Sequence, residues 1–478
     1  NNAWMAQLMM QGTNYLNFIG RYCWVAGGEH GLHAAVVTER EEPQAVIGSS
    51  LQSQAFPENY KKHLEHGKLL EHAHEHPGYD ISDKLKRPMK TRANVLSVQN
   101  RGEYLLSACG EDGVRMFDIA FIDNKGFSER ITTAPVSPVG QKFHVPTRYA
   151  TCVVAPTTTA PDPTRTHLPE NKEGRVHPMY AYVYATDKYE GLILIQIATM
   201  IDGNPLNNFL KRELTFNPDN LLVGAESVTI VGTYAYVCCD AGLVVVSLAD
   251  PKCPKVTAVI GGELVKKPRA VQVQFRYAYV VDEEGIKVFD TTDIATPKPV
   301  SKIRLPGCHN IYLARTYAYV AAGEKGLVIL DITQPDRPKL DQIFDAGGCI
   351  NDVHDVKLGI TYVSEFAYIA DGKNGLRVVQ LTSPDSPGND GFAVRPTPKL
   401  VATYKLPHGG HALAVAKGVD RDRAVDESGN QIGVFGRVGA RPLNLAEQQK
   451  LYLRNGKVWT VSNDPKDPGY HYDPPLKP

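Results

Sequence analysis

Histidines are the residues of this chain whose types and spacing are best suited to bind a metal. When the repeated YAYV segments are aligned on their alanine, one position nine residues upstream carries polar side chains. The residues at this position are Glu226, Arg269, His309, then His354 after a four-residue insertion, with His411 opening the next inner strand and Asn14 and Asn94 in the early units. Three imidazoles that converge could bind zinc, copper or iron with one coordination position open. Hydrogen bonding between neighbouring repeats, or a small-molecule site, would use the same residue types.

A second group of histidines lies in the segment YKKHLEHGKLLEHAHEH, residues 60–76. Its composition predicts a short helix that ends at Pro77 and Gly78. His63 and His66 are three residues apart, and His72 and His76 are four apart, so each pair would lie on one helical face. Such a face could bind a transition metal or an iron of a partner's haem. A solvent-exposed helix whose histidines bind nothing is the simpler interpretation, and a pH-sensitive contact is a further alternative.

The elements that must position these residues are repeated β-hairpins. The clearest copies cover residues 180–197, 234–251, 277–293, 317–340 and 366–387, and weaker copies cover 22–37 and 104–119. Each reads as a strand, a tight turn with glycine, and a second strand. We expect the recurrent glycines to supply the positive φ of the turn; they are Gly31, Gly113, Gly191, Gly242, Gly285, Gly326 and Gly375.

A further strand precedes each hairpin, and another follows it. The preceding strands are predicted at 226–233, 269–276, 309–316 and 354–360, with 14–21 and 94–101 in the early units. Four strands repeated every 40–50 residues are typical of a β-propeller, which covers the faces of its sheets by packing them around an axis. Seven four-stranded blades are expected. The segments at 411–418, 430–436, 450–455 and 457–464 could instead form an eighth blade, or close the ring against the N-terminal unit.

The repeated segment YAYVAAGEKGLVILDITQPDRP, residues 317–338, resembles the LVIVD repeat of bacterial and archaeal β-propellers. The resemblance covers roughly residues 14–410 apart from two insertions, and it is strongest at 226–387. It implies a propeller that is exported, so a periplasmic or extracellular location is expected, although no signal peptide is visible. It also implies multihaem c-type cytochromes as partners. It implies no single activity.

The composition excludes several classes of protein. The 478 residues contain 52 Lys and Arg and 52 Asp and Glu, so the chain lacks the basic field of a general nucleic-acid binder. No apolar run is long enough to span a membrane as a helix. The eight cysteines include no C-x-x-C pair, which argues against a zinc ribbon, a thioredoxin-like site and covalent c-type haem in this chain. Several of them are predicted to be small core residues.

These observations predict one all-β propeller domain over residues 1–478. Excursions are expected at 40–93, at the Pro- and Thr-rich loop 155–178 and in the tail 462–478. Because no hydrolase, P-loop or Rossmann motif is present, we favour a non-enzymatic interaction scaffold. The alternative is a metal-dependent enzyme with His309, His354 and His411 at one mouth of the channel. A structural subunit of a homo-oligomer is a third hypothesis.

Overall fold

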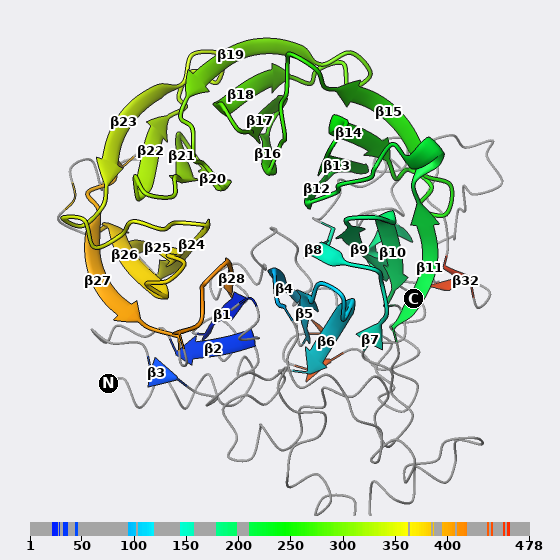
Figure 1. Cartoon of the computed structure of the whole chain (residues 1–478), viewed down its shortest axis with the longest axis horizontal. Helices are drawn as coiled ribbons and strands as arrows, with labels where there is room; N and C mark the ends of the chain where they lie inside the picture. Colours follow the sequence, from blue (N-terminus) through cyan, green and yellow to red (C-terminus); the bar gives the residue numbers. More distant parts are fainter. Residues whose placement is uncertain are drawn as a thin grey trace, which may run out of the picture.

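The computed structural model describes a ring of β-sheets around a central opening (Figure 1). The described residues are 22–26, 28, 32–36, 44–45, 94–101, 104–118, 144–156, 178–197, 210–361, 364–383, 386, 394–406 and 409–417, with short strands between 437 and 458. The sheets of the ring are antiparallel and four-stranded. The prediction of an all-β propeller with four-stranded blades is therefore confirmed.

Six blades are each made of four strands that are consecutive in the chain. The first contains β4 (Ser97–Arg101), β5 (Tyr104–Ala108), β6 (Val114–Asp118) and β7 (His144–Val145), and the second β8 (Ala150–Val154), β9 (Tyr182–Asp187), β10 (Gly191–Gln196) and β11 (Lys211–Phe216). The next two contain β12 (Ser227–Val231), β13 (Tyr234–Cys239), β14 (Gly242–Ser247) and β15 (Lys255–Ile260), then β16 (Ala270–Gln274), β17 (Tyr277–Val281), β18 (Gly285–Asp290) and β19 (Lys298–Arg304). The last two contain β20 (Asn310–Ala314), β21 (Tyr317–Ala321), β22 (Leu327–Asp331) and β23 (Lys339–Phe344), then β24 (Asp355–Thr361), β25 (Ser364–Ala370), β26 (Leu376–Thr382) and β27 (Lys399–Tyr404).

A further four-stranded sheet is composite and closes the ring. It joins β1 (Tyr22–Ala26), β2 (Leu32–Val36) and β3 (Gln44–Ala45) to β28 (Ala414–Lys417), which pairs with β1. The expectation of seven blades therefore needs correction: six blades are made of consecutive strands, and the closing sheet combines strands from distant parts of the chain. Residues 411–418 do not open an eighth blade. The place beside β1 that was predicted for residues 14–21 is taken by β28.

The remaining strands form two small sheets outside the ring. One pairs β29 (Arg437–Val438) with β30 (Arg441–Pro442), and the other pairs β31 (Leu453–Arg454) with β32 (Lys457–Val458). Two short 3-10 helices, η2 (Pro178–Ala181) and η5 (Pro218–Asn220), lie within the second blade and just after it. The predicted helix at 60–76, most of the loop at 155–178 and the tail at 462–478 lie outside the described residues. In the part of the chain that is described, no helix is long and apolar enough to cross a membrane.

The turn glycines are required for two reasons. All of the predicted ones that are described have positive φ, for example Gly242 at 111° and Gly285 at 142°. A Cβ atom at Gly285 would also overlap with the carbonyl oxygen of Ile303 and the amide nitrogen of Leu305. The outer strand therefore approaches the turn closely, and only glycine leaves room for it.

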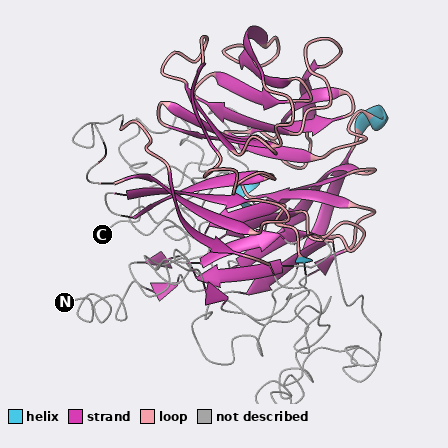
Figure 2. Ribbon diagram, turned by 60° about the vertical axis from the view of Figure 1, so that its left-hand side comes forward, coloured by secondary structure: helices cyan, strands magenta, loops and turns pink. Residues whose placement is uncertain are grey.

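The core lies between neighbouring blades, whose faces pack against one another (Figure 2). The second tyrosine of the YAYV segment is buried there, as Tyr279 and Tyr319 show with at most 1% exposure. The prediction that several cysteines are core residues is confirmed by Cys109, Cys238 and Cys308, which are buried. Each inner strand also contacts the inner strands on both sides, so β4, β8, β12, β16, β20, β24 and β28 surround the axis.

Candidate functional site

A cavity of about 480 Å³ lies between the inner strands. Side chains alternate along each of these strands, so that one set packs between blades and the other faces the cavity. Along β12, for example, Val228 and Ile230 are buried in the core, whereas Ser227 and Thr229 line the cavity. The wall is mixed: Glu226, Arg269, Gln272, Asp355 and Lys357 are polar, whereas Leu96, Val154, Leu413 and Ala414 are apolar. This cavity and its mouth contain most of the residues that the sequence singles out.

The residue just before six of the seven inner strands is fixed by one backbone hydrogen bond. Its N–H donates to a carbonyl of the second strand, for example from His309 to Ala321 and from His354 to Ala370. The residues in this place are Leu96, Glu226, Arg269, His309, His354 and Leu413. Alignment by sequence therefore places the blades correctly from Glu226 to His354. It is two residues off for Asn94 and His411, since Leu96 and Leu413 occupy the aligned place.

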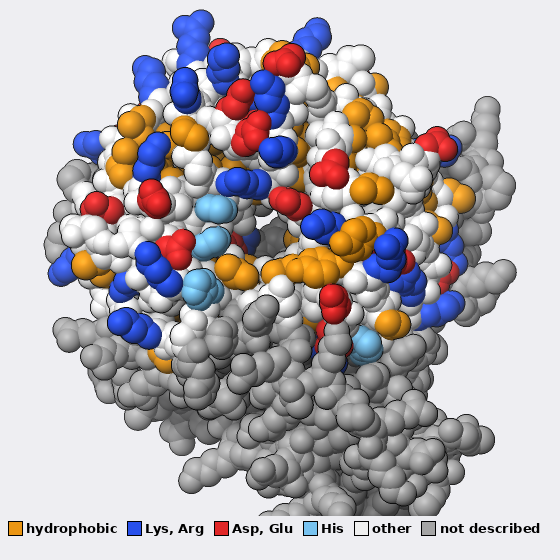
Figure 3. Space-filling model, viewed as in Figure 1, with side chains coloured by type: hydrophobic (Ala, Val, Ile, Leu, Met, Phe, Trp, Pro, Cys, Tyr) orange, Lys and Arg blue, Asp and Glu red, His pale blue; other side chains and the backbone are white. Residues whose placement is uncertain are grey.

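His309 and His354 are brought together at the mouth, where their ring centroids lie 4.5 Å apart with planes tilted by 35°. The Nε2 atom of His354 lies 3.2 Å from Oδ1 of Asp352. Burial lowers the pKa of His309 to about 4, and the neighbouring His354 and Arg269 act in the same direction. His309 is therefore neutral at physiological pH. The third predicted ligand, His411, is exposed; Figure 3 shows histidine side chains in a row beside the central opening.

Glu226 and Arg269 line the cavity near this mouth. Burial raises the pKa of Glu226, and the Arg269 guanidinium opposes that shift. Arg269 also donates from a terminal nitrogen to the carbonyl oxygen of Cys308 at 2.8 Å, which ties its blade to the next. Asn94, which was predicted to line the channel, instead donates from Nδ2 to the hydroxyl of Tyr149 at 3.2 Å. Both hydrogen bonds link neighbouring blades.

Asp355 is the most constrained carboxylate of the cavity wall, with 3% exposure. Its Oδ1 accepts from Asn310 Nδ2 at 2.6 Å, and its Oδ2 accepts from the Val415 N–H at 3.0 Å. One side chain thus connects β20, β24 and β28. Burial raises the pKa of Asp355, while Lys357, whose Nζ lies 3.9 Å away, lowers it. Both contacts are hydrogen bonds between neighbouring repeats, which the sequence leaves open as an alternative to a metal site.

Hydroxyl groups make the same kind of contact on the other side of the cavity. Ser227 Oγ donates to the carbonyl oxygen of Arg269, and Thr229 Oγ1 donates to that of Val271, both at 2.7 Å. Thr151 Oγ1 donates to the carbonyl oxygen of Ala225 at 2.8 Å. Because each acceptor belongs to another sheet or to the link that leads into it, these hydroxyls bind blade to blade.

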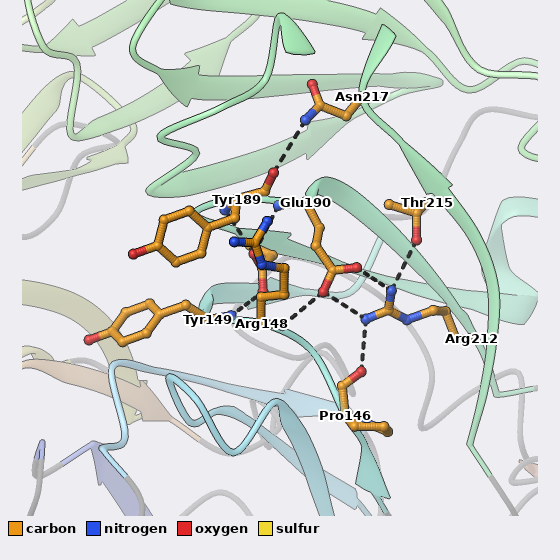
Figure 4. Close-up of polar contacts among 9 residues, drawn as sticks. Pro146, Arg148, Tyr149, Tyr189, Glu190, Arg212, Thr215 and Asn217 are labelled. Carbon is orange, nitrogen blue, oxygen red and sulfur yellow. Dashed lines mark hydrogen bonds and ion pairs between the residues drawn. The ribbon is translucent and has the colours of Figure 1, made fainter. Parts of the chain in front are cut away.

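One cluster at this end of the molecule was missed by the sequence analysis (Figure 4). Glu190 accepts hydrogen bonds from the Arg148 N–H at 2.8 Å and from Arg212 at 2.5 and 3.2 Å. These bonds, chiefly those from Arg212, lower the pKa of Glu190. Arg148 stacks on Tyr189 at 4.6 Å, and the rings of Tyr149 and Tyr189 point the same way. Arg148, Tyr149, Tyr189 and Glu190 fall in turns and linkers, where no repeated pattern marks them, and their partner Arg212 lies on β11.

Metal-ligand geometry is not assembled in the described part of the chain, where no group of three or more His, Cys, Asp and Glu side chains is placed to hold an ion. The predicted ligands His63, His66, His72 and His76 lie outside the described residues. The described site offers two adjacent histidine rings, of which His309 is neutral, and a cavity wall whose polar groups bind one another.

Comparison with known proteins agrees with this architecture. Residues 224–256, 309–346 and 360–389 match the LVIVD repeat. The chain is thus a β-propeller that contains LVIVD repeats, and the resemblance seen in the sequence is confirmed. No curated protein matches it.

Solved structures share the fold at low sequence identity. A protein from Lactobacillus plantarum is 12% identical with a TM-score of 0.50, over 83% of this chain and 98% of that one. A functionally unknown protein from Desulfotomaculum acetoxidans is also 12% identical, with a TM-score of 0.39, over 67% and 81% of the two chains. Neither likeness extends beyond the fold.

Proposed function

We propose that this protein is an extracytoplasmic interaction scaffold that docks other proteins in a redox complex with multihaem c-type cytochromes. The observation that carries the scaffold role is the use of the polar residues around the channel. Asp355, Arg269, Ser227 and Thr229 bind neighbouring blades and so make a rigid disc. The extracytoplasmic location and the cytochrome partners rest on the LVIVD resemblance.

The test is purification of the tagged full chain from its native cells at low salt. Mass spectrometry then identifies the chains that co-purify, and elemental and haem analysis is done on the same sample. A stoichiometric protein partner is the expected result, and a multihaem cytochrome would support the redox setting. A protein that elutes alone as a monomer under these conditions would contradict the scaffold.

The His-rich segment at 60–76 is the first candidate contact with such a cytochrome, because its histidines could bind a haem iron or an exposed propionate edge. A variant that lacks 60–76 should lose the partner while the ring remains folded. Replacing His63, His66, His72 and His76 by Gln in the full chain is the matched control for loss of the segment itself. Undiminished binding by both variants would remove this segment from the proposal.

A metal site at the channel mouth is the second candidate function, and the His309–His354 contact favours it. Both rings are partly buried at the mouth, and His309 is in the neutral form that binds metals. Water or His411 would supply the remaining ligands. Titration of the chelator-treated protein with ZnCl₂ and CuCl₂ should show one ion bound with micromolar or better affinity. Equal affinity of the His309→Ala and His354→Ala variants would exclude the site.

A further inference from the structure

The turns at the other end of the inner strands differ in how well their residues suit the backbone. Each is a two-residue hairpin turn between an inner strand and the second strand, and its first residue has positive φ. The residue is Gly232 at 56°, Phe275 at 54° and Arg315 at 55° in three successive blades. Glycine adopts this conformation freely, whereas a side chain costs about 1–2 kcal/mol there. Phe275 and Arg315 therefore reduce the stability of their turns.

Burial does not compensate for this cost at Phe275. Its side chain is 90% exposed, the highest value among the large hydrophobic residues that the structure describes. A Phe that packs into a core gains about 1.5–3 kcal/mol, and Phe275 gains almost none of it. An aromatic ring that is held in a strained turn and left in water indicates a role outside the folded chain itself.

Two arginines accompany this ring, Arg276 in the same turn and Arg315 in the corresponding turn of the next blade. Arg276 stacks on Tyr277 at 5.2 Å and donates to its hydroxyl at 3.0 Å, which holds the Arg276 side chain in place. The adjacent turn is tied to the first, because Gln274 Nε2 donates to the carbonyl oxygen of Arg315 at 3.0 Å. The Arg276 guanidinium has only a distant carboxylate, Asp290, at 3.8 Å, and Arg315 has no ion pair within the described ranges.

We propose that Phe275, Arg276 and Arg315, here named the aromatic tip, form a docking surface for a partner protein that has an apolar pocket bordered by carboxylates. Aromatic and arginine side chains are the residues that dominate the binding energy of protein interfaces. The pocket would take up the Phe275 ring, and the carboxylates would pair with the two guanidinium groups. One exposed ring and two arginines give too little membrane affinity for stable lipid binding, so a protein is the better occupant. The inference rests on the proposed scaffold function and names its contact surface.

The experiment compares stability and binding in the same set of full-chain variants. The partner is the purified protein that co-purifies with the wild type, and its affinity is measured by calorimetry. Phe275→Gly should raise the melting temperature by a few degrees and weaken binding at least tenfold. Arg315→Gly should also raise the melting temperature. It should weaken binding several-fold and make the affinity less dependent on the NaCl concentration. Leu340→Ala is the matched control, because Leu340 is 56% exposed but lies on the outer strand β23. Its affinity should equal that of the wild type.

Failure of the aromatic tip can be distinguished from failure of the scaffold function. A partner that binds wild type and Phe275→Gly equally would overturn the aromatic tip and leave the scaffold intact. A lower melting temperature of Phe275→Gly would also overturn it, since the ring would then support the fold. Vesicles of phosphatidylcholine and phosphatidylglycerol are the second probe: binding that is lost in Phe275→Gly would replace the protein partner by a lipid surface. If no partner co-purifies at all, the proposed function fails first.

Discussion

The two ends of the central channel use their side chains in opposite ways. At the mouth, where the inner strands begin, Arg269 and Asp355 are held by hydrogen bonds to other blades. At the far end, where these strands turn, Phe275 and Arg315 have a strained backbone conformation, and no hydrogen bond or ion pair is described for either side chain. The polar residues at the mouth, whose types suggested a binding or catalytic site in the sequence, thus hold the ring together. The turn residues at the far end, which no sequence pattern singled out, carry the exposed aromatic and cationic groups.

The difference shows how stability is distributed in a propeller. Blades are joined mainly by packing between their faces, so polar groups on the inner strands are free to bind laterally and to fix the register of neighbours. At the far end the Phe275 side chain is exposed and Gly232 has open space beside it, so a strained residue in these turns costs little beyond its own backbone. That tolerance makes the far end a suitable place for a binding residue.

The largest effect is expected at a turn on the mouth side. Gly285→Ala should destabilise the protein by about 4 kcal/mol, because the new methyl group overlaps with the outer strand at Ile303 and Leu305. Urea unfolding measures this loss. Gly232→Ala is the matched change at the far end, where no atom lies within 4 Å of the added carbon. A comparable loss at both turns would show that the two ends are equally constrained.

Asp355→Ala should cost about 3 kcal/mol, since it leaves the Asn310 amide and the Val415 N–H without their acceptor in a buried site. Asp355→Asn should cost less, because it retains one acceptor oxygen. Asp336→Ala is the control, as the side chain of Asp336 is half exposed. If Asp355→Ala unfolded at the wild-type urea concentration, the blade-to-blade bonds would not stabilise the ring.

Thr229→Val should cost about 1 kcal/mol, which is the usual value for one lost hydrogen bond, here the bond to the carbonyl oxygen of Val271. Thr257→Val, on the outer strand β15, removes a hydroxyl for which no hydrogen bond is described, and it should be nearly neutral. The difference between the urea unfolding midpoints of the two variants measures the contribution of the inter-blade hydrogen bond. Equal midpoints would contradict the lateral role of the inner hydroxyls.

The smallest effect is a pH dependence at the mouth. The folded protein keeps His309 neutral down to a pKa of about 4, while the unfolded chain protonates it near its ordinary value. Stability from this group is therefore present above pH 6.5 and is lost as pH falls toward 4. The free energy of unfolding of His309→Gln, relative to that of wild type, should rise by about 1 kcal/mol as the pH falls from 7 to 4.5. This value is reduced for solvent screening. A constant difference across this range would show that His309 titrates normally.

Most of the blade architecture was readable in the sequence. Alternating residues in segments such as YAYV, with Gly285 or Gly326 in the following turn, predict hairpins because they depend only on local geometry. The strands at 226–233, 269–276 and 309–316 appear as β12, β16 and β20 within a few residues. The candidate site was predicted less well. His309 and His354 do meet, but Leu413 takes the place that was expected for His411.

What the sequence determined by itself was therefore the repeating unit: four strands, their turns and their buried faces. Local patterns fix these because the interacting residues are neighbours in the chain. Only the tertiary structure decided which strand completes the sheet of β1, since β28 comes from a distant part of the chain. It alone also decided that Asp355 would bind across three blades and that Phe275 would stand exposed. These outcomes depend on contacts between distant segments, which closure of the ring creates.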